Sequence, residues 1–190
     1  TVLHWDGGGW TQPNGMAAIL YGVWGAATDD VWIVGAPAAI ARWNGAHVDT
    51  LPFPFPGPFA VHAAWGAAKD DVWFVGEVIH GDYSARVRES GFDSVTQYEL
   101  WKAVWSSLND GNFHELDWAL VRHNEFLDGF VPMTFVGNHD VTRIASRLDN
   151  TRHLEHALVL LFTTGGTPSV YSGDEAAYRG VKEERFGGDD

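Results

Sequence analysis

The sequence contains no cysteine among its 190 residues, and it has 12 lysines and arginines against 25 aspartates and glutamates. Without cysteine there can be no disulfides or thiolate metal sites, and the redox compartment stays open. The net charge of −13 argues against nucleic acid or an anionic membrane as a partner, because both require a basic surface. No apolar run reaches the roughly 18 to 20 residues that a membrane-spanning helix needs. These absences predict a soluble protein that binds neither nucleic acid nor membrane.

The length allows one large domain or two small ones. The chain begins at Thr1 without a signal-like apolar segment. We therefore expect a mature form, a fragment or an engineered form, and the sequence leaves the cellular location unknown.

The first part of the chain contains an internal repeat. Residues 24–35, Trp-Gly-Ala-Ala-Thr-Asp-Asp-Val-Trp-Ile-Val-Gly, recur at 65–76 as Trp-Gly-Ala-Ala-Lys-Asp-Asp-Val-Trp-Phe-Val-Gly, an offset of 41 (65 − 24 = 41). A second pair, His-Trp-Asp-Gly at 4–7 and Arg-Trp-Asn-Gly at 42–45, is offset by 38 (42 − 4 = 38). Asp-Asp predicts a turn, Val-Trp-x-Val a strand, and the Trp-Asn-Gly type a hairpin.

This repeat resembles bacterial β-propeller repeats, whose four-stranded blades recur every ~40 to 45 residues. It covers fewer than two blades, whereas about three repeats are usually needed for stability. The recurrence of tryptophan at repeat positions favours core packing over a sugar-stacking platform.

The rest of the chain alternates strand and helix patterns. Strands are predicted at 72–79, 92–96, 133–137 and 169–172, and helices at 98–108, 113–127 and from 150 or 151 to about 161. Such alternation predicts a parallel sheet built of βα units.

Two of the predicted strands end in acidic segments. Residues 75–83 read Val-Gly-Glu-Val-Ile-His-Gly-Asp-Tyr, and residues 135–140 read Phe-Val-Gly-Asn-His-Asp. Both segments resemble signature blocks of glycoside hydrolase family 13, the α-amylase family. The resemblance extends over about residues 75–190, including the segments 90–102 and 166–175. It implies strands five to eight of a (β/α)8 barrel, half of the full fold.

The resemblance also implies roles for individual residues in retaining hydrolysis of α-glucosidic bonds. Glu77 matches the general acid/base, and Asp140 matches the carboxylate that stabilises the transition state. His139 and Asn138 match residues that bind the sugar. The implied partner is an α-glucan or oligosaccharide. No metal site and no cofactor are predicted, and calcium enters by family analogy alone.

The family's nucleophile block, an Arg-x-Asp sequence upstream of the acid, has no counterpart here. Asp49 lies 28 residues before Glu77 (77 − 49 = 28), a plausible spacing for the missing nucleophile. However, no arginine precedes Asp49 by two residues, as the Arg-x-Asp block requires. We therefore expect a mixed α/β chimera, with a β-rich propeller-like segment at 1–71 joined to a half (β/α)8 barrel at 72–190. Natural recombination, engineering or computational design would each produce it.

Two functions remain open at this stage. One is an α-amylase-type hydrolase that is weak or inactive because the nucleophile strand is missing. The alternative is a catalytically silent chimeric or designed protein, or an oligomeric module that binds carbohydrate or protein. A half barrel exposes apolar side chains and strand edges, which predicts self-association.

Overall fold

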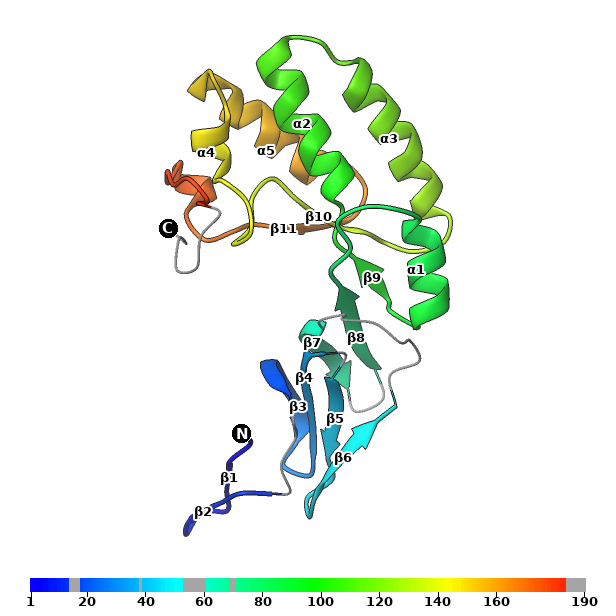
Figure 1. The fold of residues 1–190 in the computed structure, drawn as a ribbon, viewed down its shortest axis with the longest axis vertical. Helices are drawn as coiled ribbons and strands as arrows, with labels where there is room; N and C mark the ends of the chain where they lie inside the picture. Colours follow the sequence, from blue (N-terminus) through cyan, green and yellow to red (C-terminus); the bar gives the residue numbers. More distant parts are fainter. Residues whose placement is uncertain (14–17, 38, 53–60, 69–70, 184–190) are drawn as a thin grey trace. The chain divides into compact units, whose positions relative to one another are not determined.

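A computed structural model describes residues 1–13, 18–37, 39–52, 61–68 and 71–183. The chain forms two compact units (Figure 1). The first unit comprises Thr1–Glu77 and Ala85–Val95, and the second comprises Val78–Ser84 and Thr96–Asp190. The domain boundary predicted between residues 71 and 72 stays a prediction.

The first unit contains a four-stranded antiparallel sheet in chain order. Its strands are β3 (Ile19–Ala27), β4 (Asp30–Ala36), β5 (Ala39–Trp43) and β6 (Val48–Leu51). A small hairpin, β1 (His4–Trp5) and β2 (Trp10–Thr11), precedes it. Side chains alternate between the faces of a strand, and one face of this sheet buries a small core of Ile33, Ala41, Trp43 and Val48.

The second copy of the repeat forms β7 (Val61–Ala68) and β8 (Asp71–Gly76). Trp65 pairs with Trp73 across this hairpin, as Trp24 pairs with Trp32 across β3 and β4. The register shifts recur as well, at Leu20/Gly22 and Gly25/Ala27 in the first copy and at Val61/Ala63 and Gly66/Ala68 in the second. The predicted turn of the second copy includes residues 69 and 70, which lie outside the described residues.

The two copies differ in the pairing of their second strand with the next strand of the sheet. β4 pairs antiparallel with β5, whereas β8 pairs in parallel with β9 (Ser94–Val95). The four-stranded unit is therefore not repeated within the described residues, and the propeller and chimera interpretations stay predictions. The prediction that tryptophans at repeat positions pack in the core was wrong in part, since Trp5 and Trp65 are at least half exposed.

The second unit contains most of the helices: α2 (Tyr98–Asp110), α3 (His114–Leu127), α4 (Ile144–Arg147) and α5 (Leu154–Thr163). The predicted positions of α2, α3 and α5 are confirmed. The Gln97 side chain accepts the N–H groups of Glu99 and Leu100 at the start of α2, and Gly111 ends the helix with a left-handed φ of 62°. Apolar side chains on α2, α3 and α5 form the main core.

Three further helical segments are short: α1 (Tyr83–Ser90), and the 3₁₀ turns η1 (Thr151–His153) and η2 (Asp174–Ala176). In the second unit β10 (Met133–Phe135) pairs in parallel with β11 (Thr167–Ser169), and Thr96 forms a parallel bridge to Met133.

The parallel βα pattern is thus confirmed, while the strand predicted at 169–172 lies two residues earlier. The described sheets do not close into a barrel. Across the described part of the chain, no helix combines the length and apolar character needed to cross a membrane.

Candidate active site

The Asn138-His139-Asp140 turn follows β10 in the second unit. The Asn138 amide donates to the Tyr98 hydroxyl (2.9 Å), and its Oδ1 accepts the backbone N–H of Asp140 (2.9 Å). Tyr98 is itself buried, with its ring edge-on to Phe135 at 4.9 Å. The turn is therefore anchored to the buried start of α2.

The other side of the turn contacts Lys182. The Lys182 ammonium donates to the His139 carbonyl (3.2 Å) and lies 3.9 Å from Asp140 Oδ1. His139 Nε2 lies 3.2 Å from Asp140 Oδ2, and the two side chains are 61% and 43% exposed. The turn thus presents an imidazole and a carboxylate side by side at the surface of the second unit.

The buried carboxylate of Asp174 packs against Gly137, the residue directly before this turn. Asp174 is fully buried, and a Cβ on Gly137 would collide with its carboxylate. Arg143 Nη1 lies 3.2 Å from Asp174 Oδ1 and donates to the Ser172 carbonyl (2.9 Å), while the guanidinium stacks on the Tyr171 ring at 4.4 Å. Burial raises the pKa of the Asp174 carboxyl, although Arg143 opposes that shift.

The resemblance covers Asp174 within residues 166–175 but does not predict its contact with Gly137. The Gly137 position offered a signal, because a glycine directly before an active-site turn often marks a close approach by another group.

Glu77 directly follows β8 and ends the first of the two segments that form the first unit. The preceding Gly76 pairs with Val95, and a Cβ there would collide with the ring of Phe92. Glu77 is partly buried, and the unit boundary falls between it and Val78. Because Glu77 and Asp140 belong to different units, the structure describes each carboxylate within its own unit.

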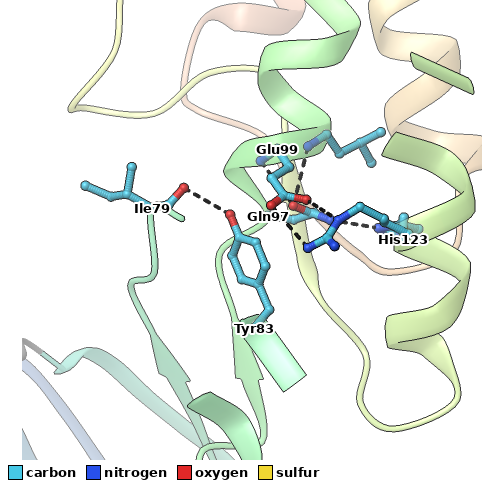
Figure 2. A network of polar contacts seen from close by, with 7 residues as sticks. Ile79, Tyr83, Gln97, Glu99 and His123 are labelled. Atoms are coloured by element: carbon cyan, nitrogen blue, oxygen red, sulfur yellow. Dashed lines mark hydrogen bonds and ion pairs between the residues drawn. The ribbon is translucent and has the colours of Figure 1, made fainter. Parts of the chain in front are cut away.

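The segment after Glu77 is held within the second unit. The Val78 N–H donates to Thr96 Oγ1 (2.9 Å), and the Thr96 hydroxyl donates to the Val78 carbonyl (3.2 Å). The Tyr83 hydroxyl donates to the Ile79 carbonyl (3.0 Å), a contact that Figure 2 shows. Burial raises the pKa of Tyr83 far above its usual value, so this phenol stays a donor. The backbone leaving Glu77 is therefore fixed at two points.

Figure 2 also shows the polar network at the start of α2. Arg122 donates from Nε to Glu99 Oε2 (2.9 Å), joining α3 to α2. His123 is fully buried, where the Gln97 amide lies 3.5 Å from Nδ1 and Nε2 contacts the Gly165 carbonyl. Burial lowers the pKa of His123.

Asp49 does not end a parallel strand. It lies on β6, half exposed, where Oδ2 accepts the Asn44 amide (2.9 Å) and Oδ1 lies 3.0 Å from His47 Nε2. No group of three or more His, Asp or Glu side chains among the described residues could hold a metal ion. Calcium remains an analogy.

Comparison with known proteins identifies a family and several relatives that the chain resembles. The family model described as "Alpha amylase, catalytic domain" matches residues 59–190. Cyclomaltodextrin glucanotransferases from Bacillus licheniformis and Bacillus sp. (strain 1-1) are 33% and 28% identical over 93 residues, 46% of this chain. Those alignments cover 12% and 13% of the two relatives, so the chain spans a small part of their length.

Solved structures give the same picture. Gamma-CGTase from alkalophilic Bacillus clarkii has a TM-score of 0.51 and 25% identity, covering 60% of this chain and 18% of that one. The cyclic α-maltosyl-(1→6)-maltose hydrolase from Arthrobacter globiformis has a TM-score of 0.50 and 25% identity, covering 63% and 28%.

Proposed function

Because the chain belongs to the family of α-amylase catalytic domains, we propose that it forms part of a glycoside hydrolase domain that acts on α-glucosidic bonds. Retaining hydrolysis needs a protonated carboxylic acid at the leaving oxygen and a second carboxylate about 5 to 5.5 Å away as nucleophile. In this proposal Glu77 is the general acid/base, Asp140 stabilises the transition state, and His139 and Asn138 bind the sugar.

The anchored turn after β10 is the observation that carries the sugar-binding part. An imidazole and a carboxylate 3.2 Å apart offer a donor and an acceptor to two neighbouring hydroxyls of one pyranose ring. Tyr98 accepts a hydrogen bond from the Asn138 side chain, and Lys182 donates to the His139 carbonyl, so the turn is fixed at two points. A fixed turn loses little conformational entropy when a sugar binds, which favours affinity.

The chemical step lacks one partner in this sequence. A covalent glycosyl intermediate requires a carboxylate opposite the acid, and no Arg-x-Asp block lies upstream of Glu77. Loss of one member of a cooperating catalytic set usually costs several orders of magnitude in rate. We therefore expect turnover by this chain alone to be at or near background.

The turnover test compares the parent chain with Glu77→Gln on a chromogenic α-glucoside. We expect equal and negligible rates, because neither protein can form the covalent intermediate. Robust turnover that disappears in Glu77→Gln would contradict this expectation and would make Asp49 the first nucleophile to examine.

The binding test titrates a maltooligosaccharide into the chain by calorimetry. We expect weak binding that His139→Ala reduces several-fold. The control is His114→Ala, which removes an exposed imidazole at the start of α3 and should leave the affinity unchanged. Equal affinities for both variants would overturn the proposed sugar site.

The alternative function is a catalytically silent module that binds carbohydrate or protein. We also propose self-association, since open sheets leave edges and apolar side chains that a closed barrel would cover. Large apolar side chains are exposed in both units, among them Val23 (70%), Trp65 (60%), Val159 (59%) and Phe162 (58%).

A further inference from the structure

The two copies of the repeat pack on each other inside the first unit. We call β3–β4 the first hairpin and β7–β8 the second hairpin. Trp32 of the first hairpin meets Phe74 of the second, with ring centroids 5.3 Å apart at 70°. Trp24 lies over Gly66, where an added Cβ would come within 2.8 Å of the Trp24 ring. The face of the first hairpin that carries Trp24 and Trp32, here called the tryptophan face, thus packs on the second hairpin at Gly66.

The second hairpin carries the same tryptophan face, but it is open. Trp65 and Trp73 are cross-strand partners at the positions equivalent to Trp24 and Trp32, 41 residues later. Trp24 is partly buried under the second hairpin, whereas Trp65 is 60% exposed.

The first hairpin carries the complementary face, which is open at Val23 and Gly25 while Ile33 on the same face belongs to the core of the sheet. Gly25 is the counterpart of Gly66 in the repeat and is exposed, whereas Gly66 is buried. Neighbouring residues of a strand point to opposite faces, so Val23 lies on the side away from Trp24, and it is 70% exposed. A cavity of about 420 Å³ on this side is lined by Val23, Val31 and Ile33 together with residues of β1.

We propose that a second copy of this chain docks its second hairpin on the first hairpin of its neighbour, repeating the contact found within the chain. Trp65 of the docking copy then lies over Gly25 of the receiving copy, as Trp24 lies over Gly66. Trp73 faces Ile33, the counterpart of Phe74, and the cavity that Ile33 and Val23 line. The contact joins two different faces, so it is heterologous and extends to rings or open chains.

The pairing of β9 with β8 leaves the beginning of β8 available for this contact. β5 pairs with β4 so that Trp43 faces Val31. The equivalent register brings Trp5 of β1 opposite Val72 of a docked hairpin, at the beginning of β8. β9 pairs with Val75 and Gly76 at the other end of that strand. Because β1 comprises only His4 and Trp5, the β1 strand of the receiving copy would lie against Val72 and Trp73, and the β9 strand of the docking copy keeps Val75 and Gly76.

This inference rests on the proposed self-association and is independent of the sugar chemistry. It is tested by sedimentation velocity on the full chain and on Trp65→Lys and Val23→Glu. Both positions are exposed, so we expect folded proteins with unchanged near-ultraviolet circular dichroism. The parent should associate with rising concentration, and each variant should associate roughly 30-fold or more weakly, as for an interface hot spot.

Mixing the two variants gives the decisive measurement. Trp65→Lys keeps an intact receiving face and Val23→Glu keeps an intact docking face, so the equimolar mixture should form a dimer and nothing larger. Trp118→Lys, at an exposed tryptophan of α3 (55% exposed), should associate like the parent.

Three results would overturn the inference. A parent that stays monomeric across the micromolar range would remove both the self-association and this surface. A parent-like association of Trp65→Lys or Val23→Glu, or a mixture that stays monomeric, would remove this surface alone.

Discussion

The two copies of the repeat share a sequence pattern, a register and both irregularities, yet they have different surroundings. The first copy continues into β5 and β6 and belongs to an antiparallel sheet. The second pairs in parallel with β9 and ends at Glu77. The local pattern therefore determines the hairpin, whereas residues outside the pattern determine its neighbours. The same twelve-residue motif can contribute to a small antiparallel core or lead into a candidate catalytic strand.

The largest difference in stability that we expect between the two copies comes from an aspartate that is buried in the first copy and exposed in the second. Asp30 is fully buried and forms an ion pair with Arg42, whereas its counterpart Asp71 is exposed. We expect Arg42→Met to lower the free energy of unfolding by about 3 kcal/mol, because it leaves a buried carboxylate without its cation. Asp71→Asn should change it by less than about 0.5 kcal/mol. Urea unfolding followed by tryptophan fluorescence measures both, and equal losses would contradict the comparison.

The two equivalent glycines should differ by a smaller amount. A Cβ at Gly66 would collide with the Asp71 carbonyl oxygen of the same hairpin and would also lie 2.8 Å from the Trp24 ring, whereas at Gly25 the nearest atom is a Val31 methyl at 3.0 Å. We expect Gly66→Ala to cost about 1 to 3 kcal/mol through overpacking, and Gly25→Ala to cost less. Thermal unfolding of the two variants tests this order, and a larger loss at Gly25 would reverse it.

We expect a still smaller effect in the second unit, where the buried His123 makes stability depend on pH. Its pKa is lowered by burial from an unfolded value of 6.5, so below that pH the unfolded chain binds more protons than the folded one. Stability is therefore retained above pH 6.5 and falls as the pH decreases toward the folded pKa. His123→Gln should flatten this dependence in urea unfolding between pH 5 and 7. A slope identical to that of the parent would assign the effect to other groups.

Much of the second unit could be predicted from the sequence. The helical periodicity of apolar residues predicted α2, α3 and α5, because this signal is local. The family could be identified because its motifs are contiguous in the sequence.

Burial of individual side chains could not be predicted in the same way. Trp24 and Trp65 have the same local sequence but different exposure, since exposure depends on which hairpin lies against each. His123 and Asp174 are polar residues whose burial depends on contacts with segments distant in the sequence. The roles of Glu77, Asp140, His139 and Asn138 stay predictions that the binding and turnover measurements address.

The contact between Gly137 and Asp174 constrains the order in which this chain can change. A methyl group at position 137 collides with the buried carboxylate, so Gly137→Ala is tolerated only after Asp174 has been replaced by a smaller residue. Replacing Asp174 first leaves Arg143 without its buried partner. Any stepwise replacement of these two residues therefore passes through a less stable intermediate. Substitutions at positions 137 and 174 should accordingly occur together rather than separately.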